Sequence, residues 1–135
     1  MTGEVFDGNI EYVAGYQGPL DSILGYPLYF ILKDVFMGKQ TMWKIHDFDQ
    51  SAQNAFSQPD VLANFVSNHD NPRWLNMYSD WTTFKSVITF LYFYNGIPII
   101  YYGDEQGFHG GSDPDCRENL WGHMNTDGEL YKYIQ

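Results

Sequence analysis

Three pairs of polar side chains could take part in chemistry, because each pair lies at or just after a short apolar run. The pairs are Glu4 with Asp7, His69 with Asp70, and Asp104 with Glu105. Carboxyl groups transfer protons and accept hydrogen bonds, and an imidazole can donate one. If the runs are parallel strands, the residues that follow them share one rim of the sheet, where active sites of α/β proteins form. The spacing therefore predicts a site on such a rim.

The elements that would position these residues alternate along the chain. Strands are expected at 3–6, 26–31, 62–66 and 97–102, the last buried on both faces. Apolar residues at helical spacing predict helices at 41–56 and 81–94, and further helices are expected to begin near Leu32 and at Asp113, with Pro114 in the first turn. The alternation predicts an α/β fold with a parallel sheet. It fits a small open sheet or a piece of a barrel, because a (β/α)8 barrel needs eight strands and about 250 residues.

The composition restricts the partners. The chain has 135 residues and a formal net charge of -10, which disfavours nucleic acid and an anionic membrane surface as partners. The 11 Tyr, 10 Phe and 4 Trp suit either a large core or a cleft for the flat faces of sugars. Residues 87–94 form the most apolar stretch, which is too short to cross a membrane. Cys116 is the single cysteine and indicates no compartment.

Five motifs follow one another along nearly the whole chain. They are GEVFDG at 3–8, LGYPLY at 24–29, FVSNHDNPR at 65–73, GIPIIYYGDEQ at 96–106 and GGSDPDCRE at 110–118. Together they resemble strand regions five to eight, and the loop after strand eight, of the α-amylase family of glycoside hydrolases, with fungal-type members the most similar. The resemblance implies a partial (β/α)8 TIM barrel, in which residues 1–135 form the C-terminal part of the catalytic barrel. The family's nucleophilic aspartate lies on strand four in a Gly-x-Arg-x-Asp pattern that is absent here, so we expect a fragment.

The resemblance also implies roles for the first two pairs. Retaining glycoside hydrolysis uses two carboxyl groups, a nucleophile and an acid/base. Glu4 matches the acid/base, and a water-poor strand end would help such a carboxyl to hold its proton. Asp70 and His69 match residues that bind and distort the sugar in the −1 subsite. Asn68, Asp70 and Asn71 before Pro72 also predict an ordinary Asx-turn, which is compatible with that role.

The remaining assignments are less distinctive. Asp113 and Arg117 match residues that contact a sugar on the non-reducing side, but they could equally be a helix cap and its ion-pair partner one turn later. Phe6 and Gly8 match positions near the leaving group, although Phe6 could belong to the core. No residue is assigned to a metal, because His46, Asp47 and Asp49 fit no common ligand spacing. The family implies calcium, with ligands mostly in its N-terminal half, and no other cofactor.

The resemblance thus predicts part of a hydrolase of α-1,4-glucosidic bonds in starch, glycogen or maltooligosaccharides. We expect the isolated chain to be inactive, because the covalent intermediate needs the nucleophile. A related transglycosylase or α-glucosidase would share these motifs, and a non-catalytic glucan-binding remnant is the alternative from another class. The family is usually exported, which implies an extracellular protein, and the oligomeric state stays open.

Overall fold

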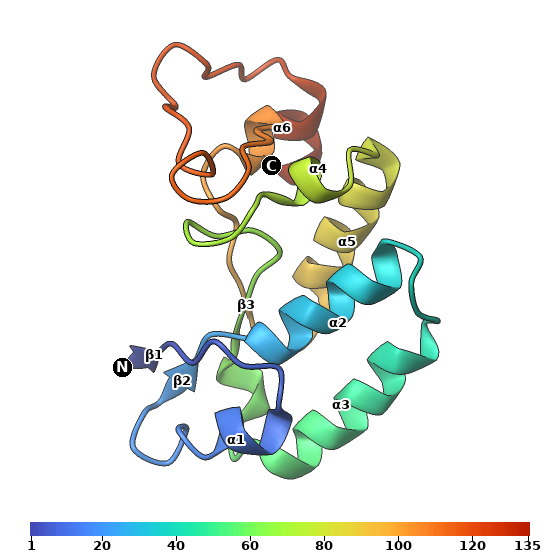
Figure 1. The fold of residues 1–135 in the computed structure, drawn as a ribbon, viewed down its shortest axis with the longest axis vertical. Coiled ribbons are helices and arrows are strands. Elements are labelled where there is room, and N and C mark those ends of the chain that lie inside the picture. The colour runs from blue at the N-terminus through green and yellow to red at the C-terminus, as the bar shows by residue number, and fades with distance from the viewer. The chain divides into compact units, whose positions relative to one another are not determined.

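The computed structural model describes residues 1–135, which form two compact units. Unit 1 comprises residues 1–65 and 91–99, and unit 2 comprises residues 66–90 and 100–135. Figure 1 labels the elements of both units along the chain. None of the helices combines the length and the apolar character that crossing a bilayer requires.

The strands of unit 1 are short, parallel and paired in chain order. They are β1 (Thr2–Gly3), β2 (Ser22–Ile23), β3 (Ala63–Asn64) and β4 (Ile97–Pro98). Strand β1 pairs with β2, and β3 pairs with β4. A parallel bridge between Leu24 and Ala63 links the two pairs. Parallel strands that neighbour each other in sequence order are the arrangement of a (β/α)8 barrel.

The strand predicted at 26–31 is wrong, and the runs predicted at 3–6, 62–66 and 97–102 are strands over only part of their length. The run at 97–102 is a strand only at Ile97–Pro98, and Ile97 is 50% exposed rather than buried. The run at 26–31 lies in helix α2 (Tyr26–Phe36), and the strand before it is Ser22–Ile23. Pro27 suits the first turn of a helix, where its missing N–H costs nothing. A helix buried on most sides reads as a continuous apolar run, so periodicity alone did not identify it.

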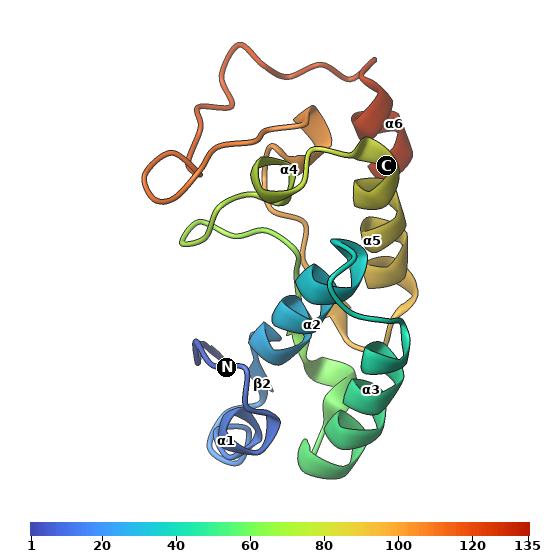
Figure 2. The same ribbon diagram turned by 45° about the vertical axis from the view of Figure 1, so that its right-hand side comes forward.

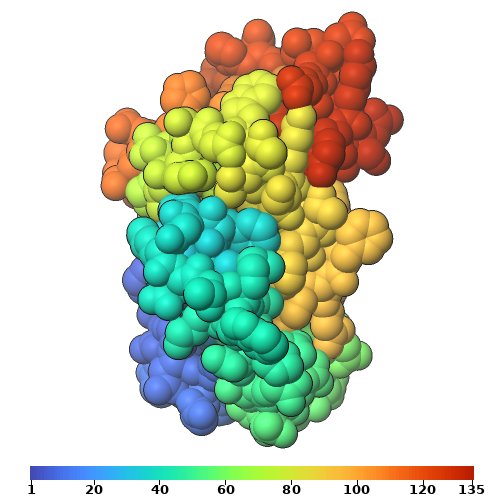
Figure 3. All heavy atoms as spheres, turned by 90° about the vertical axis from the view of Figure 1, so that its right-hand side faces the viewer, coloured from blue at the N-terminus to red at the C-terminus, as the bar shows by residue number.

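The other helices of unit 1 lie on either side of α2 in the sequence. Helix α1 (Ile10–Ala14), which was not predicted, is capped by Asn9, whose Oδ1 accepts the N–H of Tyr12 at 2.8 Å. Helix α3 (Trp43–Ala55) confirms the predicted helix at 41–56, with Ile45, Phe48 and Ala52 buried. A 3-10 turn, η1 (Pro59–Val61), follows it. Helices α2 and α3 lie side by side in both ribbon views (Figures 1 and 2). The colours of the two segments are also adjacent in the space-filling view (Figure 3).

An aromatic cluster forms part of the core of unit 1. It consists of Tyr26, Tyr29 and Phe65, which are 2% exposed or less. The Phe65 ring stacks on Tyr29 at 5.2 Å and meets Tyr26 edge-on at 5.0 Å between centroids. Edge-on and offset rings are the favoured geometries of aromatic pairs, so this cluster holds α2 rigidly beside the end of β3.

Unit 2 combines short helices with a long loop. It contains α4 (Trp74–Met77), the first residues of α5 (Trp81–Phe93), the 3-10 turn η2 (Asp104–Gln106) and α6 (Glu129–Ile134). Helix α5 confirms the prediction at 81–94. The helix predicted to begin at Asp113 is absent, since residues 107–128 form a loop with turns only (Figure 1). Asp113 and Pro114 are joined by a cis peptide bond.

Candidate functional site

Unit 2 brings four of the predicted site residues together. His69 and Asp70 are exposed, and the His69 Nε2 lies 3.5 Å from the Asp70 Oδ2. Arg117 connects this pair to the long loop. Its Nε donates to the His69 carbonyl at 2.9 Å, and its Nη2 donates to the Asp70 Oδ1 at 3.3 Å. Its Nε also lies 3.0 Å from the Asp113 Oδ1. The guanidinium therefore holds two carboxylates and a carbonyl in one cluster.

The backbone of this cluster is set by the predicted turn. The Asn68 Oδ1 accepts the N–H groups of Asp70 at 3.2 Å and Asn71 at 3.0 Å, so the Asx-turn is confirmed. The predicted ion pair of Arg117 with Asp113 is confirmed too, but Asp113 caps no helix because none follows it. A local turn on one side and a guanidinium on the other thus fix the His69 carbonyl and the Asp70 carboxylate.

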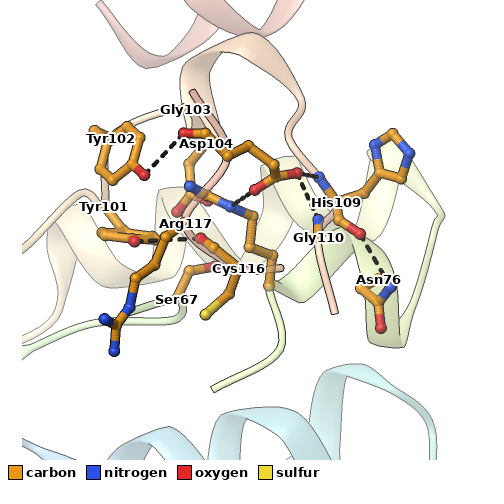
Figure 4. A network of polar contacts seen from close by, with 12 residues as sticks. Ser67, Asn76, Tyr101, Tyr102, Gly103, Asp104, His109, Gly110, Cys116 and Arg117 are labelled. Atoms are coloured by element: carbon orange, nitrogen blue, oxygen red, sulfur yellow. Dashed lines mark hydrogen bonds and ion pairs between the residues drawn. The ribbon is translucent and has the colours of Figure 1, made fainter. Parts of the chain in front are cut away.

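A buried ionic network lies beside this cluster (Figure 4). Arg73 is fully buried, and its Nη1 donates to the Asp104 Oδ1 at 3.2 Å while its Nε binds the Glu118 Oε2. Its guanidinium also lies over the rings of Tyr101 at 4.3 Å and Tyr102 at 5.0 Å. Asp104 is accordingly a structural residue, whereas Tyr101 and Tyr102 stack on a cation rather than extending a strand.

The electrostatics of this network are dominated by burial. Asp104 is 2% exposed, and its burial raises the pKa of this carboxyl to about 7. The Arg73 charge and the hydroxyl of Ser67 act in the opposite direction, since both stabilise the carboxylate. Desolvation therefore outweighs the ion pair, and Asp104 changes its charge near neutral pH.

In unit 1, Glu4 directly follows β1 and is exposed, so the expected water-poor surroundings are wrong for this chain. Its Oε1 accepts a hydrogen bond from the Tyr26 hydroxyl at 2.8 Å. Tyr26 is 1% exposed and belongs to the aromatic cluster, so it is a rigid donor. The carboxyl of Glu4 is therefore oriented by the core, although it faces solvent.

Phe6 and Gly8 lie beside helix α2, to which Tyr26 belongs. Phe6 is 64% exposed, which excludes a core position, and its ring meets Tyr26 edge-on at 4.9 Å and Phe30 at 5.7 Å. Gly8 is exposed, and a Cβ added there would lie 3.3 Å from the Phe30 ring. Glu4, Phe6 and Gly8 thus present one acid, one exposed ring and one exposed glycine that packs closely on Phe30 along the chain after β1.

Reasoning from the sequence missed the partners of these residues. Tyr26, Arg73 and Glu118 are separated from their partners by 22 to 45 positions, and no local pattern links them. The only signal for Arg73 was its place in the motif at 65–73. A buried arginine that is paired and stacked can be inferred only once the fold is known.

A metal site is not formed by these residues. No group of three or more His, Cys, Asp or Glu side chains is placed to hold a metal ion. Asp49 of the acidic group in α3 instead accepts a hydrogen bond from the Tyr94 hydroxyl at 2.9 Å.

Comparison with known proteins gives one consistent family. Residues 1–132 match the family described as alpha amylase, catalytic domain. The chain is 40% identical over 136 residues to an α-amylase of Saccharomycopsis fibuligera and 39% identical over 134 residues to α-amylase 1 of Schwanniomyces occidentalis. These matches cover 98% of the chain but only 27% and 26% of the relatives. The chain thus spans about a quarter of the length of the curated relatives that it matches.

Solved structures agree with these relatives. An α-amylase from Malbranchea cinnamomea is 40% identical and superposes with a TM-score of 0.93, covering 98% of this chain and 29% of that one. An α-amylase from Geobacillus thermoleovorans, solved in complex with acarbose, is 28% identical with a TM-score of 0.87, covering 98% of this chain and 31% of that one. The three-domain cyclomaltodextrin glucanotransferase CldA is 27% identical with a TM-score of 0.86, covering 99% and 28%.

Proposed function

Because the chain belongs to the α-amylase family of glycoside hydrolases and forms part of a TIM barrel, we propose that it supplies strands five to eight, with their helices, to the catalytic barrel of a retaining α-amylase. The substrates are α-1,4-glucans: starch, glycogen or maltooligosaccharides. The observation that carries this proposal is the cluster in which Arg117 holds His69, Asp70 and Asp113. Residues 1–135 are then one piece of a single catalytic domain.

The cluster has the chemistry of a sugar subsite. Sugar hydroxyls both donate and accept hydrogen bonds. The Asp70 carboxylate accepts them, whereas the His69 imidazole donates one, and both side chains are exposed enough to reach a ligand. In the −1 subsite these contacts would strengthen as the ring flattens toward the oxocarbenium-like transition state. Arg117 and Asp113 would contact a sugar further toward the non-reducing end.

Glu4 is the acid/base in this proposal. The hydrogen bond from Tyr26 fixes the rotamer of the carboxyl, and a fixed carboxyl can deliver its proton to the leaving oxygen at a defined place. Phe6 and Gly8 lie on the leaving-group side, where the exposed Phe6 ring offers a face for a sugar. The nucleophile comes from a part of the longer protein with the family's Gly-x-Arg-x-Asp pattern, which also closes the barrel.

Two further properties belong to that longer protein. Its calcium would be held mostly by residues outside this chain, since the present residues form no ligand group. Its place would be extracellular, as the family resemblance implies.

A chimera tests the proposal. The matched segment of the Malbranchea cinnamomea α-amylase, 29% of that chain, is replaced by these 135 residues. We expect the chimera to hydrolyse maltoheptaose with retention at the anomeric carbon. Glu4→Gln should lower kcat by about 10²–10⁴-fold, because an amide cannot transfer the proton. The matched control is Glu11→Gln, which changes another exposed carboxyl in the first turn of α1 and should leave kcat unchanged.

Three other results of the chimera experiment would favour a different acid/base, a transglycosylase or a non-catalytic protein. Full activity in the Glu4→Gln chimera would exclude Glu4 as the acid/base. Products longer than maltoheptaose would favour a transglycosylase, the second candidate, which the similarity to the glucanotransferase supports. A folded chimera that binds acarbose but releases no sugar would indicate a glucan-binding protein instead of an enzyme.

A further inference from the structure

The carboxylate of Glu118 closes the base of the loop that carries Arg117. Its Oε1 accepts two backbone N–H groups at the start of the loop, from His109 at 2.9 Å and from Gly110 at 2.6 Å. Glu118 itself lies at the end of the same loop. One side chain thus joins the two ends of residues 109–118.

The other carboxylate oxygen of Glu118 is bound by a buried arginine, Arg73. The Glu118 Oε2 binds the Nε of Arg73, which is fully buried, paired with Asp104 and stacked on Tyr101 and Tyr102. Such a guanidinium has little freedom to move, because charge, stacking and burial all restrict it. The Arg73 N–H also donates to the Gly110 carbonyl at 3.1 Å. Arg73 therefore gives the loop a fixed base.

The same loop also contacts the proposed sugar subsite at His69. Between its two ends, the Cys116 Sγ donates to the His69 carbonyl at 3.1 Å, and the Arg117 Nε donates to the same oxygen. The Tyr101 hydroxyl binds the Cys116 carbonyl at 3.2 Å, and the Tyr102 hydroxyl binds the Glu118 carbonyl at 2.9 Å. The guanidinium that fixes Asp70 is hence one residue away from the carboxylate that fixes the loop.

We propose that Glu118, fixed by Arg73, is a positioning residue that sets Arg117 against His69 and Asp70. The inference rests on the proposed function of that cluster. The chemistry requires a carboxylate, because both oxygens of Glu118 only accept: one from Arg73, the other from two backbone N–H groups. A glutamine would turn an NH2 group toward one of these donors and lose the charge that faces Arg73.

Cys116 provides the test, because it is the only thiol and is fully buried within this loop. The full chain is reacted with a thiol reagent, and the labelling rate is measured at increasing urea. We expect Glu118→Gln to label at least about tenfold faster than wild type, since losing charge-assisted hydrogen bonds favours the open loop. The rate should depend little on urea, because local opening exposes little surface whereas global unfolding exposes much.

The matched control is Glu129→Gln, which removes a carboxylate paired with Lys85 in the same unit. Labelling of Glu118→Gln no faster than this control, or faster only through a urea-dependent global unfolding, would overturn the proposal. If Glu118→Gln does not fold, Tyr102→Phe decides, because it removes only the hydroxyl bound to the Glu118 carbonyl. It should label faster than the control, and an unchanged rate would also overturn the proposal. A chimera that fails to bind glucans would overturn the proposed function but leave these rates informative.

Discussion

Arg117 lies between two carboxylates and a carbonyl on the surface of unit 2, and it is about half exposed. Exposed ion pairs contribute only about 0–1 kcal/mol to stability, because water screens them and the side chains lose entropy. The planar guanidinium nevertheless binds several oxygens at fixed angles, which an ammonium cannot do. The value of this residue therefore lies in geometry rather than in stability.

This difference leads to a prediction for the chimera. Arg117→Lys should weaken acarbose binding about tenfold, equivalent to ~1.4 kcal/mol, whereas the free energy of unfolding should change by less than about 1 kcal/mol. Calorimetric titration and urea denaturation measure the two effects. The control is Lys132→Met, which removes an exposed cation paired with Asp127. Equal affinity in Arg117→Lys and in this control would contradict the binding role of Arg117.

The second prediction at this scale concerns pH. The pKa of Asp104 is raised to about 7 in the folded chain, against an ordinary value of 3.8. Between about pH 4 and 7 the folded chain binds more protons at this site than the unfolded chain, so the contribution of Asp104 to stability falls as pH rises through this window. Below pH 4 that contribution is fully present, and above pH 7 the loss is complete.

Asp104→Asn tests this, since an amide of nearly the same shape stays neutral throughout. Urea denaturation at several pH values gives the unfolding free energies of wild type and variant. As the pH rises from 4 to 7, the wild type should lose unfolding free energy relative to the variant, and above pH 7 the difference should be constant. A difference that does not change with pH would contradict the raised pKa and show that the Arg73 charge fully offsets the burial of Asp104.

At the scale of elements, helix α5 begins with a strong side-chain cap. The Asp80 Oδ2 accepts the Thr83 hydroxyl at 2.5 Å and the Thr83 N–H at 2.8 Å, and these hydrogen bonds lower the pKa of Asp80. A cap of this kind satisfies N–H groups that have no partner within the helix. Asp80 therefore determines where α5 begins.

Replacing this cap gives the third prediction. Asp80→Ala should lower the free energy of unfolding, because the first N–H groups of α5 lose their side-chain acceptor. The stability that Asp80 contributes is present above its unfolded pKa and is lost as the pH falls through the lower folded value. Urea denaturation at neutral and acid pH measures both effects. Asp127→Ala, at an exposed carboxylate, is the control, and an equally small loss in both variants would argue against capping by Asp80.

Which elements could be predicted depends on how local their signals are. Helices α3 and α5 carry regular apolar spacing and were predicted from it, whereas α2 begins with six apolar residues, 26–31, that read as a buried strand. The site residues His69, Asp70 and Arg117 were predicted from motifs. Their support by Arg73 and Glu118 was not, because these contacts join positions 45 apart. Turns and helices leave a signal in neighbouring residues of the sequence, whereas contacts between distant positions leave none.

At the scale of the whole molecule, the chain corresponds to about a quarter of its curated relatives. A retaining mechanism needs two carboxyl groups that face the same bond. The sequence provides the proposed acid/base but no Gly-x-Arg-x-Asp pattern. The activity of the family is therefore a property of a larger assembly of strands.

The fourth prediction follows from this. The purified 135-residue chain should release no reducing sugar from maltooligosaccharides, because no covalent glycosyl intermediate can form without the nucleophile. A reducing-end assay measures this, and the chimera serves as the positive control. Turnover by the isolated chain with retention of configuration would contradict the assignment of the nucleophile to another segment.

The order of the strands in unit 1 has a consequence for biosynthesis. Strand β1 pairs with β2, Leu24 beyond β2 bridges to β3, and β3 pairs with β4. Each strand that leaves the ribosome thus finds its partner already synthesised, and none waits for a distant segment. The ribosome adds about 5–20 residues per second, which is slow compared with the formation of a hairpin or the closure of a loop. The sheet can therefore grow vectorially, one strand and one crossover at a time, while translation proceeds.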